Sequence, residues 1–99
     1  MFNRTILNER FQQSKVDQVW EKGKLIPGKD PDFWRKDTCG AVMYKPQYGQ
    51  ETSYGWEIDH IQPKSKGGSD DIVNLQPLQW ENNRYKADNW PNWTCKNKS

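Results

Sequence analysis

Trp56-Glu57-Ile58-Asp59-His60-Ile61-Gln62-Pro63 is the stretch on which the predicted fold depends, together with a partner segment over residues 74–88. The first stretch predicts a short strand that ends in a carboxylate and the only histidine of the chain. The partner predicts a brief extended piece over residues 74–76, followed by a polar helix. Residues 64–71 between them are mostly Lys, Ser, Gly and Asp, a composition typical of a loop. An acid, an imidazole and a carboxamide brought together in this way suit a hydrolytic site for a hard metal ion.

The order of Asp59 and His60 places a condition on such a site. Neighbouring residues on a regular strand point to opposite faces. The two side chains serve one site only if the strand ends or bends there, and Pro63 favours an early end. We therefore expect the site at a strand terminus, with Glu57, which shares the face of Asp59, as a supporting acid.

Two helices are predicted upstream of this strand. The first covers residues 15–22, with Ser14 as its N-cap and Gly23 as a left-handed C-terminal cap. Its apolar face favours a cover over the core, and consists of Val16, Val19 and Trp20. Docking on DNA through Lys15 and Lys22 is the alternative interpretation of the same helix. Asp30-Pro31-Asp32 favours the start of a second, short helix, and Leu7 and Phe11 are spaced for one further helical turn.

Two strands are predicted to pair as an antiparallel hairpin, one over residues 39–45 and one over residues 54–58. After the loop, Pro77 suits the first position of a helix that runs to Ala87. Trp90 and Trp93, in the C-terminal tail, are expected to fold back onto the body of the domain.

Length and composition predict one small domain. A chain of 99 residues buries only about 60–65% of its unfolded surface. The apolar fraction is 32%, but six Trp, four Tyr and three Phe indicate an aromatic-rich core. The same residues argue against disorder over residues 14–93, and disorder stays an open alternative for the two ends of the chain. The net charge of +2 is weak evidence for a polyanionic partner, so any contact with DNA has to come from local clusters of cations.

The chain has two cysteines, Cys39 and Cys95, and no C-x-x-C pair, so it lacks a zinc knuckle. No signal peptide or span of membrane length is visible, which favours the cytoplasm and two free, buried thiols. A disulfide between them stays open. A zinc site made of both cysteines and His60 matches no known ligand spacing.

Several of these residues resemble the HNH endonuclease motif, also called the ββα-metal or His-Me finger, over residues 55–90. They are Asp59-His60-Ile61, Gly67-Gly68, Asn74-Leu75, Asn83 and Lys86. Residues 82–89 are especially similar to the helix of the HNH domain in CRISPR RNA-guided nucleases, whereas the missing zinc knuckles depart from the zinc-bearing branch of the family. The resemblance implies an α+β fold: a small single domain over residues 1–99 with an antiparallel β-hairpin, a ββα-metal finger as motif core and an N-terminal helix within an extension over residues 1–38.

The resemblance also implies a metal-dependent endonuclease that hydrolyses DNA phosphodiester bonds and leaves a 5′-phosphate and a 3′-hydroxyl. By position, His60 matches the general base, Asp59 and Asn83 match the ligands of one divalent metal ion, and Asn74 matches the residue that braces the loop. The residue types agree with these roles, because imidazole titrates near neutral pH and carboxylate and amide oxygens suit Mg²⁺, with Mn²⁺ or another divalent ion as alternatives.

Four cations near the motif are expected to contact phosphate groups of DNA, and ordinary solubilising surface is the alternative interpretation: Lys64, Lys66, Arg84 and Lys86. Two rival functions remain, a non-catalytic nucleic-acid-binding module on the same finger and a small interaction domain whose aromatic residues bind a protein partner. One finger holds one site, so cutting both strands would require a dimer.

Overall fold

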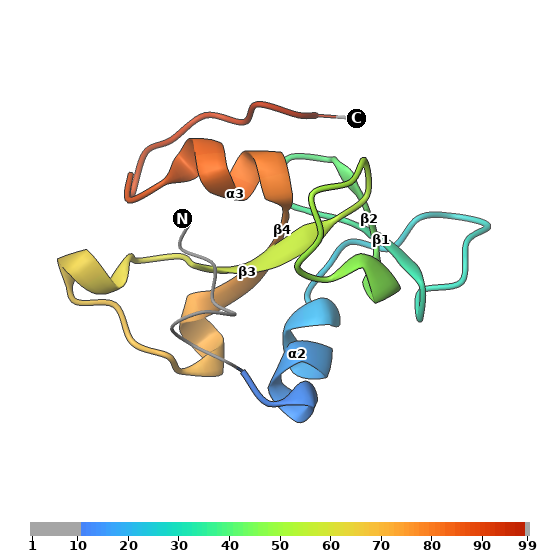
Figure 1. The fold of residues 1–99 in the computed structure, drawn as a ribbon, viewed down its shortest axis with the longest axis horizontal. Coiled ribbons are helices and arrows are strands. Elements are labelled where there is room, and N and C mark those ends of the chain that lie inside the picture. Colours follow the sequence, from blue (N-terminus) through green and yellow to red (C-terminus); the bar gives the residue numbers. More distant parts are fainter. Residues whose placement is uncertain (1–10, 99) are drawn as a thin grey trace.

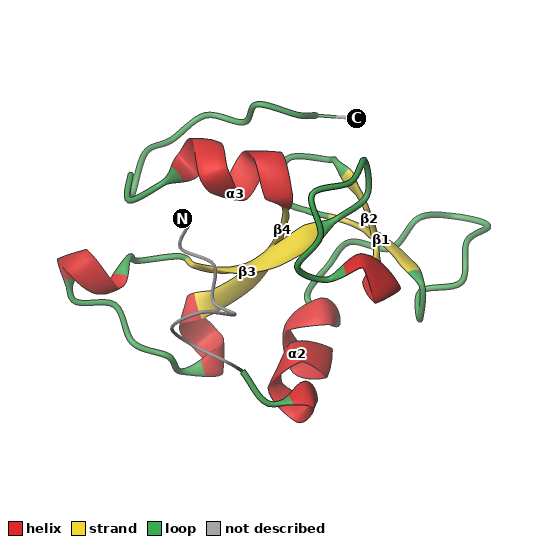
Figure 2. Cartoon of the chain, viewed as in Figure 1, coloured by secondary structure: helices red, strands yellow, loops and turns green. Residues whose placement is uncertain are grey.

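Two antiparallel strand pairs form the framework of the computed structural model, which describes residues 11–98 (Figures 1 and 2). β1 pairs with β2, and β3 pairs with β4. Helix α2 packs on one side of the β3–β4 pair and helix α3 on the other (Figure 1). The bounds are α2 Gln13–Trp20, β1 Trp34–Lys36, β2 Val42–Tyr44, β3 Trp56–His60, β4 Leu75–Gln79 and α3 Trp80–Lys86. This is the small α+β domain that was predicted, and β3, β4 and α3 form its ββα finger.

The core lies between α2 and the β3–β4 pair. Alternation along β3 turns Trp56 and Ile58 toward α2, and both are almost completely buried. The predicted apolar face of the first helix is confirmed, since Val16, Val19 and Trp20 are buried. The Trp20 and Trp56 rings lie 5.1 Å apart between centroids, so aromatic contacts supply much of this core.

The predicted pairing of residues 39–45 with residues 54–58 is wrong. β2 pairs instead with β1, in a region where a short helix starting at Asp30 was expected. Only one turn forms there, in which the Phe33 and Trp34 N–H groups donate to the Asp30 carbonyl. The chain then extends, because Trp34 packs against Tyr44 across the hairpin, with ring centroids 4.6 Å apart.

Helix α3 begins three residues later than predicted. Pro77 lies within β4, opposite Ile58, and is not the first residue of the helix. The N–H of Gln79 points away from β3 and donates to Asp37. Pro77 lies two residues earlier on β4, so its nitrogen faces the same way, and the N–H that proline lacks would not have bonded to β3. The Gln79 side chain then caps α3 by accepting from the Glu81 and Asn82 N–H groups.

The bounds of α2 also differ from the prediction. The helix starts at Gln13 with Gln12 at the N-cap position, two residues before the expected Ser14 cap, and ends at Trp20, two residues earlier than predicted. Gly23 is not left-handed; it is required because a Cβ there would lie 2.9 Å from the Cβ of Arg35. The possible turn at Leu7 lies outside the described residues.

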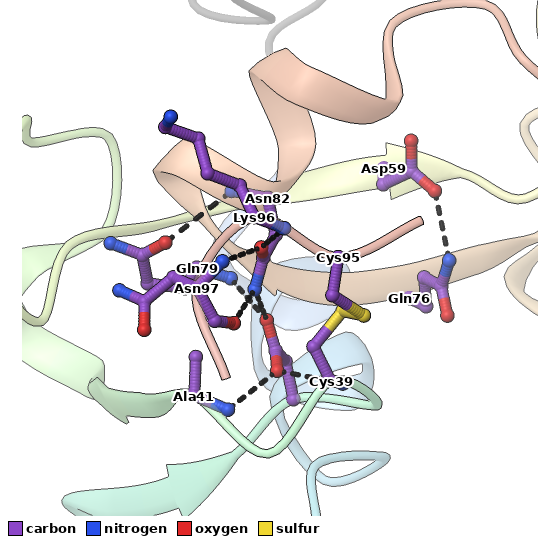
Figure 3. Close-up of a disulfide and its surroundings, with 10 residues drawn as sticks. Cys39, Ala41, Asp59, Gln76, Gln79, Asn82, Cys95, Lys96 and Asn97 are labelled. Carbon is purple, nitrogen blue, oxygen red and sulfur yellow. Dashed lines mark hydrogen bonds between the residues drawn. A yellow bond between two sulfur atoms is a disulfide. The ribbon is translucent and has the colours of Figure 1, made fainter. Parts of the chain in front are cut away.

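Cys39 and Cys95 form a disulfide that joins the β1–β2 turn to the C-terminal tail (Figure 3). The expectation of two free thiols is therefore wrong, and a zinc site that uses both sulfur atoms is excluded. Next to the bond, the buried Asp37 carboxylate accepts from Cys39 N, Ala41 N, Gln79 N and Asn82 Nδ2. Asn82, on α3, also binds the tail at residues 96–97, so this network fastens α3 to the rest of the domain.

Among residues 11–98, no helix is long and apolar enough to cross a membrane.

Candidate active site at the end of strand β3

The candidate site lies where β3 ends, at His60, as the sequence predicted. Beyond it, the chain makes a loop that contains a short 3₁₀ helix (Lys64–Lys66) and returns through a second one (Ile72–Asn74) into β4. Gly68 is required in this loop, because a Cβ there would lie 1.7 Å from the Gln62 carbonyl oxygen. The close approach of these two backbone segments fixes the shape of the loop at its base.

Asn74 fastens both sides of the same loop. Its Oδ1 accepts from Gln62 N at 2.9 Å, and its Nδ2 donates to the carbonyl oxygens of Gln62 at 3.1 Å and Ser69 at 2.8 Å. These three bonds satisfy the side-chain amide and hold the loop against the end of β3. They are the kind of contact that the bracing role assigned to Asn74 requires.

Asp59 lies on the face of β3 that is covered by α3, and its side chain is only 6% exposed. One carboxylate oxygen accepts from Gln76 Nε2 at 2.9 Å (Figure 3), and the other lies 3.2 Å from Lys86 Nζ. Burial raises the pKa of the Asp59 carboxyl, and hydrogen bonds from Gln76 and Lys86 oppose this effect. The ammonium of Lys86 thus supplies the positive charge that a buried carboxylate needs.

Asn83 lies on the face of α3 that is turned toward β3. Its Nδ2 donates to Glu57 Oε1 at 2.7 Å, which leaves the carbonyl oxygen of the same amide as the atom available to a cation. Glu57 also binds Arg84 through both carboxylate oxygens, at 3.2 and 2.8 Å, and Arg84 reaches Glu51 at 3.2 Å. The hydrogen bonds that Arg84 donates to Glu57 raise the pKa of the Arg84 guanidinium. Glu57 therefore lies on the Asp59 side of β3, as expected, and its partners are Asn83 and Arg84.

The His60 ring lies on the other face of β3, the face that carries α2. Its Nε2 lies 2.7 Å from Asp70 Oδ1, and its ring centroid is 6.1 Å from that of Phe11, just before α2. Asp70 gathers two more cations, with Lys64 Nζ 3.3 Å from its Oδ2 and Lys15 Nζ 2.7 Å from its carbonyl oxygen. The hydrogen bond from His60, followed by that from Lys64, lowers the pKa of the Asp70 carboxyl.

Asp59 and Asn83 thus both lie in the layer between β3 and α3, each with its own partners, while the His60 ring leaves β3 on the opposite side. The strand end does not turn both neighbouring side chains toward one face, although it leaves them next to each other at the rim of the sheet. The four cations expected on one phosphate-binding surface are also divided. Lys64 and Lys66 are exposed on the loop, whereas Arg84 points to Glu57 and Lys86 is buried against Asp59.

The residues at the candidate metal site fit a divalent cation. Asp59 and Asn83 supply a carboxylate and an amide oxygen, which are hard donors. The Asp59 carboxylate already holds a cation, Lys86 Nζ, so its position suits positive charge. A metal ion there has to share Asp59 with Lys86 or displace it. No three His, Cys, Asp or Glu side chains within residues 11–98 are grouped to hold a metal, so any site here has to rely on the amide of Asn83 and on water or substrate oxygens.

Two residues of the site were not predicted from the sequence, and one was given another role. Asp70 was assigned only to the loop, and Gln76 only to a short extended piece. Gln76 could have been found from the register of the strands, since it pairs with Asp59. Lys86 lies three residues after Asn83 on one helix face, and that face had to meet the acidic face of β3. For Asp70, the local sequence carries no signal, because the shape of the loop decides that it meets His60 and Lys64, and its third partner, Lys15, comes from a distant element.

Comparison with known families gives one match: residues 45–89 match the family model for HNH endonucleases. The matched segment contains β3, β4, α3 and the loop between them. No curated protein and no solved structure matches the chain.

Proposed function

Because residues 45–89 match the family model for HNH endonucleases, we propose that this chain hydrolyses phosphodiester bonds of DNA with the help of one divalent metal ion. Mg²⁺ suits the oxygen donors best, and Mn²⁺ is the nearest alternative. The observation that carries the proposal is the family match over the segment in which Asp59, His60, Asn74 and Asn83 occur in order.

In this mechanism, His60 acts as general base and a ring nitrogen takes the proton of the attacking water. Asp59 and Asn83 would hold the ion, which when bound neutralises charge on the scissile phosphate and on the leaving oxygen. Asn74 keeps the loop against the end of β3, and Glu57 keeps the Asn83 amide in one orientation. Because His60 is the last residue of β3, a phosphate at the rim of the sheet can approach both faces.

A nicking assay on supercoiled plasmid tests this proposal. Wild-type protein should nick the plasmid with Mg²⁺, and EDTA should abolish the activity. His60→Ala should lower the rate by about 10²–10⁴-fold, the usual contribution of a general base. Gln18→Ala, an exposed change on α2, is the matched control and should nick at the wild-type rate. Undiminished nicking by a folded His60→Ala protein would rule out the base assignment.

The metal assignment needs a separate measurement. Asp59→Asn should weaken the binding of Mn²⁺, which is measured by the paramagnetic broadening of NMR signals from α3. The same variant should nick the plasmid more slowly. Normal Mn²⁺ binding in this variant would show that the ion lies elsewhere. Folding is checked by circular dichroism, because Asp59 is buried.

A second function, a non-catalytic nucleic-acid-binding module, is favoured by one observation. The Asp59 carboxylate is already neutralised by Lys86, and the His60 ring lies on the other face of the strand. This function predicts binding of DNA without metal and no nicking under any ion of a Mg²⁺, Mn²⁺, Ni²⁺ and Zn²⁺ panel.

Two further parts of the proposal are independent of the chemistry. Cutting both strands requires a second copy of the site, so linear product should depend on protein concentration if a dimer forms.

A cytoplasmic location stays a prediction. The Cys39–Cys95 disulfide bears on it, since such bonds persist mainly in oxidising compartments, and a thiol titration of protein from each compartment measures the bond directly.

A further inference from the structure

Three positively charged or proton-donating groups from three elements converge on one exposed loop acid. His60 comes from the end of β3, Lys64 from the first 3₁₀ helix and Lys15 from α2. His60 Nε2 and Lys64 Nζ lie 2.7 Å and 3.3 Å from the two carboxylate oxygens of Asp70, whereas Lys15 Nζ lies 2.7 Å from its main-chain carbonyl oxygen. Lys15 is 55 residues away from Asp70 in sequence, so this is not a local loop contact.

Among residues 11–98, the contacts that hold the side chain of Asp70 are exposed. The Asp70 side chain is 47% exposed and that of Lys64 is 50% exposed, whereas the His60 side chain beneath them is 13% exposed. Exposed ion pairs contribute little to stability, so they exchange readily for another anion. The Asp70 carboxylate therefore occupies an anion site that solvent and ligands can reach.

We propose that His60 and Lys64, with the Lys15 ammonium beside them on the Asp70 main chain, form a binding site for a backbone phosphate of DNA, and that the Asp70 carboxylate occupies the place of the phosphate until the strand displaces it. A phosphate has more charge and more acceptor oxygens than a carboxylate, so it competes well with Asp70 for His60 and Lys64, and one of its remaining oxygens can accept from Lys15. The inference rests on the proposed function, because it assigns the position of a phosphate beside His60. It also gives Lys15, on α2, a role in binding DNA.

The other charges on the loop favour the approach of a DNA phosphate that displaces the Asp70 carboxylate. Lys66 lies exposed two residues after Lys64 and adds positive charge on the same loop. Asp71 is exposed next to Asp70, and none of the three donors is placed against its carboxylate by the contacts above. This pair of neighbouring acids allows a matched comparison, since removing either one changes the net charge equally.

The experiment measures the affinity of a fluorescent DNA duplex for the intact protein in EDTA, so that cleavage plays no part. Asp70→Asn should bind the duplex about two- to fivefold more tightly than Asp71→Asn, the factor expected when an exposed ion pair no longer competes. Lys15→Gln and Lys64→Gln should each weaken binding and lower the slope of log K against log salt by about 0.9. Lys36→Gln, on β1, is the control for loss of one positive charge elsewhere.

If Asp70→Asn and Asp71→Asn bind equally tightly, Asp70 does not occupy the site and the proposal fails. If Lys15→Gln behaves like Lys36→Gln, the participation of α2 is refuted. A nicking assay on the same variants separates this inference from the proposed function. Nicking with equal affinities refutes only the phosphate site, whereas the predicted affinities without nicking support the site and refute the nuclease. If either Lys15→Gln or Lys64→Gln misfolds, the other variant still tests the site, because the two lysines belong to different elements.

Discussion

On the α3 side of β3, Asp59 and Glu57 lie buried against Lys86 and Arg84, while on the α2 side His60 shares the exposed Asp70 with Lys64. Both groups contain acids and bases in contact at similar distances, from 2.7 to 3.3 Å. They differ in access to water. A buried charge has to be neutralised by the protein itself, so its partner is part of the fold. An exposed charge keeps its hydration, so its partner can be replaced by a ligand at little cost.

This difference assigns separate tasks to the two sides. The α3 side carries the two predicted metal ligands, and its present cation is a lysine that belongs to the fold. The α2 side carries the predicted base in a group that a phosphate can enter. A nuclease needs both, so the rim of the sheet at the end of β3 is where the two sides have to act on one substrate.

The largest effect should follow from removing the buried cation. Lys86→Met leaves Asp59 buried without its positive partner and should lower the free energy of unfolding by about 3–5 kcal/mol, as urea denaturation would measure. Lys64→Met removes a lysine from the exposed group and should cost less than about 1 kcal/mol. Equal losses in the two variants would remove the distinction between the two sides.

A double variant refines this test. Lys86→Met combined with Asp59→Leu replaces the ion pair with apolar side chains and should recover most of the lost stability. If the double variant is as unstable as Lys86→Met alone, the loss arises from the bond between Lys86 and the His60 carbonyl, or from packing, and not from the unpaired carboxylate.

A second, smaller effect concerns the disulfide, which joins the β1–β2 turn to the tail that Asn82 of α3 binds. Cys39 and Cys95 are 56 residues apart, and reduction of such a bond should cost about 2–4 kcal/mol by freeing the unfolded chain. Because Asn82 links α3 to the tail beside Cys95, hydrogen exchange should rise in α3 more than in residues 61–71. The Cys39→Ser and Cys95→Ser double variant without reductant should reproduce the result, and a rise confined to the loop would contradict it.

How much of this was predictable depended on how local each feature is. The buried face of α2 follows from spacing within one helix, and the end of β3 at His60 follows from nearby residues, and both were predicted correctly. The pairing of β1 with β2 was not predicted, because the local sequence around Trp34 favours a turn of helix and does not show that Trp34 pairs with Tyr44. Pro77 misled the prediction of α3, since its place in an outer strand depends on what lies beside that strand.

The candidate site shows the same limit at the level of side chains. The motif named Asp59, His60 and Asn83, but sequence order does not say that Lys86 would neutralise Asp59 or that Lys15 and Lys64 would meet at Asp70. These partners are set by how α2 and α3 pack on opposite faces of β3. Lys86 is buried because α3 packs against β3, and this packing depends on the whole fold.

The smallest effect concerns pH, and it separates the two carboxylates by sign. The pKa of Asp70 is lowered from 3.8, so its contribution to stability is present above that value and is lost as the pH falls through the lower pKa of the folded state. The pKa of Asp59 is raised from 3.8, so the folded state holds its proton more tightly and stability falls as the pH rises from 3.8 through the raised value. Carboxyl ¹³C chemical shifts should therefore titrate below 3.8 for Asp70 and above it for Asp59, and Asp70→Asn should flatten only the more acidic part of the stability curve. Two carboxyl groups that titrate together would contradict these opposite shifts, and with them the burial of Asp59 and the hydrogen bonds to Asp70 that cause them.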